Sequence, residues 1–128
     1  MSGQSHEYQK KKQMNENPEN AAAPVTPTTQ VGTRLLFEND RVRVWDLALA
    51  PGEWLESHIH REDFFFVVAS GGHLRHADPN NPSDAHEVRY EDGQVVFLEA
   101  PEDILHHRLT NIGTEPYRNF VIELKPMP

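Results

Sequence analysis

Two histidines that stand two residues apart, His58 and His60, are the residues of this chain whose spacing most directly suggests chemistry. In a β-strand, side chains i and i+2 project from the same face, so both imidazoles would point the same way. Their nitrogens could then bind one metal ion at about 2.0–2.2 Å each. A partly exposed strand with two solvated histidines has the same spacing, and for an isolated pair that interpretation would be preferred.

A third histidine, His107, lies in a second strand-like run after a turn-rich insertion and shifts the balance toward a metal site. The chain contains no cysteine, so an ion would be held by nitrogen and oxygen ligands. Such ligands suit Fe(II), Mn(II), Ni(II), Zn(II) or Cu(II). The neighbouring His106 competes for the same role, because adjacent strand residues face opposite sides and only one of them can turn inward.

The bulk composition limits the classes of partner. The chain has 128 residues, which is enough for one domain with a core of its own. A formal net charge of −8 argues against a nucleic acid or an anionic membrane surface as the partner. No apolar run approaches the roughly 18 residues of a membrane span, and the N-terminus lacks the apolar segment of a signal peptide. We therefore expect a cytoplasmic protein without a nucleic-acid or membrane partner.

The chain divides into an N-terminal arm and a β domain. Residues 1–30 contain few large apolar groups and many polar ones, so they bury too little surface to offset their ordering entropy and are predicted to form a flexible arm. The alternative is an arm that docks on a neighbouring subunit. Residues 31–128 are predicted to form one domain. Its short apolar or alternating runs are separated by turn residues, and no segment keeps a helical period for three turns. This pattern predicts an all-β sandwich or barrel.

The expected strands cover residues 33–38, 41–49, 53–60, 63–70, 73–77, 85–90, 94–98, 105–110 and 117–124, with a loop at residues 78–84.

The order of glycines and histidines resembles the two sequence motifs of the cupin superfamily. The first motif is matched by Gly52, His58, His60 and Gly71. The second is matched by Gly93, Pro101, His107 and Asn111, with a stretched turn before the histidine. The resemblance covers residues 31–125 and implies a jelly-roll barrel, also called a double-stranded β-helix, with a metal inside near its open end. The motif's spacing to the asparagine selects His107 over His106.

The opening of the domain carries a narrower resemblance. Residues 32–53, GTRLLFENDRVRVWDLALAPGE, are similar to small stand-alone cupins that are labelled β-alanine-degradation proteins.

The chain departs from the first motif at Phe64, which stands where cupins usually place a glutamate ligand. Because a phenyl ring cannot coordinate, the resemblance implies a metal held by His58, His60 and His107, with open positions for water, substrate or O₂. If the strand stays regular, Glu62 shares the face of the histidine pair, and His60, Glu62 and His107 form an alternative ligand set. A bulge after the pair would redirect Glu62.

Other side chains are expected to line the pocket around the metal. Phe64 and Phe66 alternate inward with His60 and should form an apolar wall that contacts the substrate. Glu62 and Tyr90 are candidates for a catalytic base.

A substrate carboxylate would need a cationic partner, and Arg118 is the candidate. It shares a strand face with Phe120, Ile122 and Leu124, whose apolar character predicts that this face is inside. At the mouth of a barrel, its guanidinium could bind a carboxylate through two hydrogen bonds.

The resemblance implies a metal-dependent protein that acts on a small molecule, and an Fe(II)-dependent three-histidine dioxygenase is the leading expectation. The alternatives are a lyase or isomerase that uses the ion as a Lewis acid, and a non-catalytic module that binds a metal or small molecule. The segment Arg41–Trp45 carries large side chains on both of its faces. A homodimer that buries the second face would explain them, and cupins are commonly dimers.

Overall fold

The computed structural model describes residues 28–100, 104–106 and 108–127, and these form an all-β domain. The strands are β1 (Arg34–Glu38), β2 (Val42–Leu49), β3 (Trp54–Leu55), β4 (His58–His60), β5 (Asp63–Ser70), β6 (Gly72–Asp78), β7 (Asn81–Tyr90), β8 (Val95–Leu98), β9 (Ile104–His106), β10 (Arg108–Asn111) and β11 (Tyr117–Leu124). The expected arm, residues 1–30, lies outside the described residues except for its last three.

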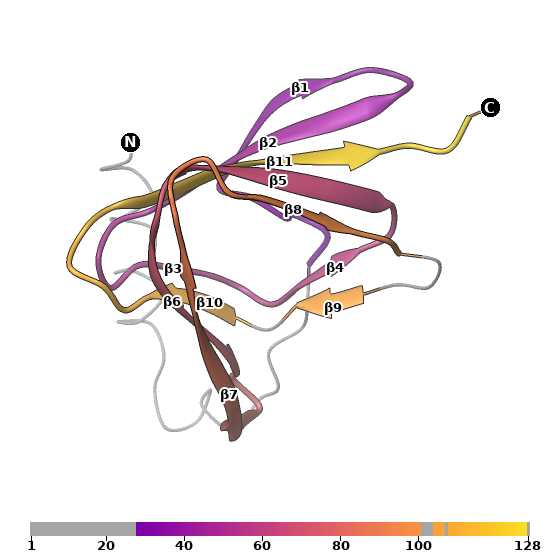
Figure 1. Cartoon of the computed structure of the whole chain (residues 1–128). Coiled ribbons are helices and arrows are strands. Elements are labelled where there is room, and N and C mark those ends of the chain that lie inside the picture. Colours follow the sequence, from indigo (N-terminus) through magenta and orange to yellow (C-terminus); the bar gives the residue numbers. More distant parts are fainter. Residues whose placement is uncertain (1–27, 101–103, 107, 128) are drawn as a thin grey trace.

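Two large sheets and one strand pair build the domain (Figure 1). The five-stranded sheet has the order β1-β2-β11-β5-β8, and the four-stranded sheet has the order β3-β10-β6-β7. Strands β4 and β9 pair with each other beside these sheets. All of these strand pairs are antiparallel. The expected all-β jelly-roll architecture is confirmed.

The alternation of side chains along β5 separates the core from the outer surface. Phe64, Phe66 and Val68 are buried, whereas the residues between them are partly exposed. Period-2 alternation in a half-buried strand has this result. Together with residues of the facing sheet such as Leu74 and Leu109, they form one apolar core between the two large sheets.

Two of the predicted runs are each divided between different sheets. The run expected at residues 53–60 separates into β3, which pairs with β10, and β4, which pairs with β9. The run expected at residues 105–110 separates in the same way into β9 and β10. Alternation holds only within one strand, so the facing of a residue in β10 does not fix the facing of a residue in β9.

The loop expected at residues 78–84 is shorter than predicted. Asp78 at the end of β6 pairs with Asn81 at the start of β7, so only Pro79 and Asn80 make the turn. This segment has the polar composition typical of a loop because the tip of the hairpin lies at the surface.

Two glycines of the cupin-like motifs stand where the backbone requires them. Gly52 and Gly93 have φ angles of 86° and 82°, a region in which a side chain is strained. Asn111, the asparagine of the second motif, is fully buried, and its amide group donates hydrogen bonds to the carbonyls of Leu49 and Glu115. It therefore fixes the loop before β11 to β2.

The last residues of the expected arm contact the strand that carries the histidine pair. The backbone N–H of Thr28 donates to Ser57, and its carbonyl accepts a hydrogen bond from the N–H of Ile59. Thr28 thus belongs structurally to the domain. Within the described part of the chain, no helix has the length and apolar character needed to span a bilayer.

Candidate metal centre

The pairing of β4 with β9 brings three histidines to one place. His58 and His60 project together from β4, as their spacing predicts, and both are buried. In the antiparallel register, His58 lies directly opposite His106 of β9. Residues directly opposite each other in an antiparallel pair project from the same face, so His106 joins the pair.

One ring nitrogen from each of these three histidines lies within 4.8 Å of the others. Among the described residues, these three histidines form a group of potential metal ligands. Nitrogens bound at about 2.1 Å to one ion lie roughly 3 Å apart, so small side-chain rotations would close the rings around it.

The third histidine of the described group is His106, the neighbour of the residue that the motif spacing selects. His107, which the motif spacing selects, lies outside the described residues, so its role stays a prediction. The expectation that His106 turns away from the pair is corrected, because the ring centroids of His106 and His60 are 4.8 Å apart.

The second ring nitrogen of His58 has a defined partner. His58 Nδ1 lies 3.0 Å from the carbonyl oxygen of Glu56, which can only accept a hydrogen bond. The Nδ1 atom therefore carries the proton, and the lone pair is placed on Nε2, where it can bind a metal.

Both buried histidines are neutral at neutral pH. Burial lowers the pKa of His58 to about 4, against the opposing effect of the Glu56 carbonyl. Burial also lowers the pKa of His60 to about 2, with further contributions from His58 and His106. Neutral imidazoles are the form that binds metals, so no proton has to be displaced at neutral pH.

These pKa values predict how the stability of the metal-free protein depends on pH. Below about pH 6.5, the unfolded chain protonates His58 and His60 whereas the folded chain does not, so the unfolded state binds more protons. The free energy of unfolding should therefore fall as the pH drops from 6.5 to 4, by at most about 1.4 kcal/mol per pH unit for each histidine. Above pH 6.5 this contribution is constant.

Urea unfolding with a chelator present at pH 7.5, 5.5 and 4.5 measures this dependence. A His58→Gln variant, which cannot titrate at this position, should have a shallower slope than the wild-type chain. Equal slopes would contradict the prediction.

The three histidines form part of the wall of a cavity of about 350 Å³ between the two large sheets. Most of the remaining wall is apolar and includes Phe64, Phe66, Leu98 and Leu105. Among the described residues that line it, none is an aspartate, glutamate, lysine or arginine. The cavity therefore suits a small molecule with an apolar body.

The two phenylalanines lie where the sequence predicts them. Phe64 is 1% exposed, and its ring stacks on His60 with 3.6 Å between the centroids and 9° between the planes. Phe66 is also buried and meets Tyr90 edge-on at 5.4 Å. Phe64 thus holds the His60 ring from one side, although it cannot bind a metal itself.

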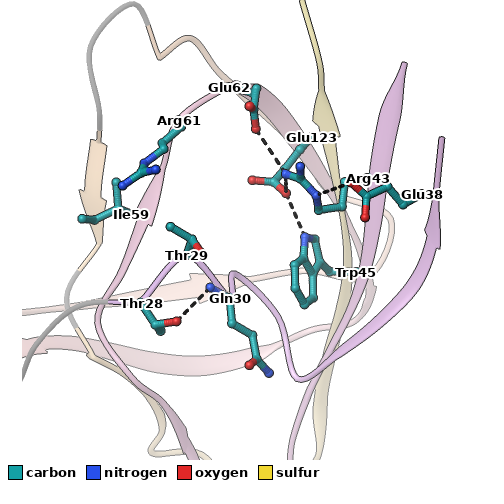
Figure 2. Close-up of a pocket in the computed structure, with 10 residues that line it drawn as sticks. All are labelled: Thr28, Thr29, Gln30, Glu38, Arg43, Trp45, Ile59, Arg61, Glu62 and Glu123. Carbon is teal, nitrogen blue, oxygen red and sulfur yellow. Dashed lines mark hydrogen bonds and ion pairs between the residues drawn. The ribbon is translucent and has the colours of Figure 1, made fainter. Parts of the chain in front are cut away.

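Glu62 does not join the histidines. The chain bends between β4 and β5, and this bend turns the carboxylate toward Arg43, whose Nη1 atom donates to Glu62 Oε1 at 3.3 Å. Glu62 lines a second pocket on the other side of β4 (Figure 2). Its expected roles as a ligand or a base at the histidine site are therefore corrected.

Arg118 faces outward, which corrects its predicted position. In β11 the buried residues are Tyr117, Asn119, Val121 and Glu123, so the inner face is the opposite of the one expected. The Arg118 guanidinium binds Asp46 through two hydrogen bonds of 2.9 and 3.0 Å. It is not available in the cavity to hold a substrate carboxylate.

Tyr90 lines the cavity, but its environment argues against a role as a base. Burial raises the pKa of the Tyr90 phenol, so the group keeps its proton. A protonated phenol can donate a hydrogen bond to a bound molecule.

Sequence reasoning missed three other polar residues of the cavity wall. His76 and His86 lie opposite each other in the β6–β7 hairpin, with stacked rings 4.8 Å apart. Asn119 is buried in β11, and its side-chain N–H donates to the Tyr117 hydroxyl at 2.6 Å. The Oδ1 atom of Asn119 has no hydrogen-bond partner among the described residues. The turn at Pro79 and Asn80 places His76 opposite His86. A tight hairpin predicted at this point of the sequence would have brought the two histidines together.

Comparison with solved structures identifies the fold as that of the cupins. A cupin domain from Bordetella pertussis Tohama I has a TM-score of 0.62 at 20% identity, covering 80% of this chain and 99% of that one. An RmlC-like cupin with a double-stranded β-helix fold from Methanocaldococcus jannaschii has a TM-score of 0.56 at 16% identity, covering 86% and 87%. A cupin superfamily protein from Desulfitobacterium hafniense DCB-2 has a TM-score of 0.53 at 17% identity, covering 88% and 93%.

Similarity at these identities shows a shared fold and nothing further about activity. Comparisons with protein-family models and with curated proteins give no match.

Proposed function

We propose that this protein binds a divalent transition metal through His58, His60 and His106 and acts on a small, largely apolar organic molecule. The observation that carries the proposal is the convergence of three imidazoles, two of them buried and held neutral, on one wall of a cavity. An ion held by neutral ligands alone keeps its full charge and could polarise a substrate or react with O₂.

The reaction that we favour is oxygenation of the substrate by a dioxygenase that uses Fe(II). The ligand set consists of nitrogen atoms, which suits Fe(II) but also Mn(II), Ni(II), Zn(II) and Cu(II). Three protein ligands leave further coordination positions for a substrate and O₂. The apolar wall formed by Phe64 and Phe66 would exclude water from the bound substrate.

The polar groups of the cavity indicate how a substrate would be oriented. The unpartnered Oδ1 atom of Asn119 could accept a hydrogen bond from a hydroxyl or N–H group of the substrate. Tyr90 could donate one to an oxygen. A substrate with two polar ends could place one end at the histidines and form a hydrogen bond to Asn119 with the other.

The alternative is a lyase or isomerase in which the ion acts as a Lewis acid. This chemistry needs a group that accepts a proton, and the stacked pair His76 and His86 in the cavity wall could serve.

Anaerobic reconstitution of the protein with each metal, followed by measurement of O₂ uptake with thiols, diketones and short-chain acids, tests the proposal. Uptake that depends on the metal and is lost in His60→Ala, but not in the surface variant His73→Ala, is the expected result. Proton exchange with D₂O without O₂ uptake would favour the lyase or isomerase. Protein that retains no metal would overturn the proposal.

We also propose that a second copy of the chain packs on the outer face of the five-stranded sheet. Val95 and Phe97 of β8 are 60% and 55% exposed, and their cross-strand partners Val67 and Phe65 extend the same apolar face across β5. An exposed apolar face can pair with itself around a two-fold axis.

Sedimentation velocity of the full chain is expected to show a dimer that Phe97→Glu converts to monomer. Ile112→Glu changes an exposed apolar residue away from this face and should leave the dimer intact. A wild-type monomer at all concentrations would contradict the proposal.

A further inference from the structure

The His60 ring has one buried nitrogen that the contacts of the metal centre leave without a hydrogen bond. His60 is 2% exposed, and its Nδ1 atom is buried without a hydrogen-bond partner among the described residues. His58, two residues earlier, has its Nδ1 atom fixed by a backbone carbonyl. A buried ring nitrogen without a partner is costly, so the residues around it require attention.

A buried carboxylate from another sheet lies close to this atom. The Oε2 atom of Glu123 lies 4.0 Å from His60 Nδ1, and the Glu123 side chain is 3% exposed. Small side-chain rotations that shorten the distance between these two atoms by about 1 Å would bring them to hydrogen-bond distance. In β11, Glu123 is the residue directly opposite Phe64 of β5.

The other oxygen of Glu123 is held firmly in place (Figure 2). Its Oε1 atom accepts hydrogen bonds from Arg43 Nη1 at 2.9 Å and from Trp45 Nε1 at 2.8 Å. Both donors come from β2, the strand next to β11. They fix the orientation of the carboxylate, with Oε2 as the oxygen nearest His60.

We propose that Glu123 is the positioning residue of the metal centre, which accepts a hydrogen bond from His60 Nδ1 and so directs the His60 Nε2 lone pair to the ion. This inference rests on the proposed function, because it assigns a role to Glu123 in that same site. Glu123 stands next to the metal ligand and is not a ligand itself.

The chemistry of the three groups agrees with this role. An imidazole that donates from Nδ1 to a carboxylate is fixed in one tautomer and one orientation, and it becomes a more basic ligand. Phe64 stacks on the face of the same ring, so ring stacking and a hydrogen bond together restrain His60. Phe64 stands at the position where the first motif would place a carboxylate. Its cross-strand neighbour is Glu123, which brings a carboxylate close to Nδ1 of His60 instead.

The Arg43 cluster supplies a matched control for the test. Glu62 also accepts a hydrogen bond from Arg43 Nη1, at 3.3 Å, but it is not part of the histidine group. Glu123→Gln and Glu62→Gln therefore each remove one negative charge that pairs with Arg43, and only Glu123→Gln changes the group beside His60. In Glu123→Gln, an amide N–H can face Nδ1 and favour the tautomer with the proton on Nε2, which cannot bind a metal through Nε2.

Two measurements test the proposal. Competition with a chelator should show that Glu123→Gln weakens Zn(II) or Fe(II) binding by about 10- to 100-fold, whereas Glu62→Gln changes it less than about threefold. Nitrogen-15 NMR of the metal-free protein should show the His60 proton on Nδ1 in the wild-type chain and in Glu62→Gln, and on Nε2 in Glu123→Gln.

The NMR measurement separates this proposal from the proposed function. If the wild-type chain binds no metal but His60 carries its proton on Nδ1, the function fails and the contact with Glu123 is supported. A wild-type His60 with its proton on Nε2 would overturn the proposal without any variant having to fold. If the wild-type chain binds a metal, equal metal affinities of the two glutamine variants would also overturn it.

Discussion

Replacing His106 by alanine should abolish tight binding of a divalent transition metal, whereas replacing His107 should not. His106 lies opposite His58 in the pairing of β4 with β9, and it completes the group whose nitrogens lie within 4.8 Å. Removal of a direct ligand should cost more than the about 10- to 100-fold loss typical of an outer-shell partner. His106 is only partly buried, so the fold should tolerate the change.

Metal content after dialysis and chelator competition measure this difference. His73→Ala provides the control, since His73 pairs with Glu87 at the surface and is not among the cavity-lining residues described. Loss of binding in His107→Ala with normal binding in His106→Ala would show that the motif spacing selects the ligand correctly.

The fold could be predicted largely because local pattern and pairing agree along most of the chain. The limits of the strands predicted at residues 63–70 and 117–124 match β5 and β11. Period-2 alternation also places His58 and His60 on one face, and Phe64 and Phe66 inside. These predictions need only one strand at a time.

The errors occur where the answer depends on which strand lies beside which. The inner face of β11 was assigned wrongly because both of its faces are apolar at several positions, and the true inner face contains Asn119 and Glu123. Composition favours the face of Phe120 and Ile122, although that face is outside. Buried polar residues at a functional site break the rule that the more apolar face is the inner one.

The facing of His106 has the same explanation. A regular strand through residues 105–110 would place His106 and Arg108 on one face, but β9 and β10 pair with different strands. The facing of His106 is set by β4, which lies more than 40 residues earlier in the chain. No periodicity within the second motif contains this information.

Replacing Phe64 by alanine should lower the free energy of unfolding of the metal-free protein by about 3–5 kcal/mol. Phe64 is 1% exposed in the core between the sheets, so the truncation leaves a cavity that the surrounding strands cannot fill. It also removes the ring that stacks on His60 at 3.6 Å, which frees the imidazole to rotate. Metal affinity should therefore fall as well.

Phe66→Ala separates these two effects. Phe66 is on the same strand and face and is also buried, but its ring contact is with Tyr90. Urea unfolding should show losses of similar size in the two variants, whereas chelator competition should show weaker metal binding only in Phe64→Ala. Equal metal affinities would mean that stacking on Phe64 does not restrain His60, and that the orientation of this ligand depends on its Nδ1 contact alone.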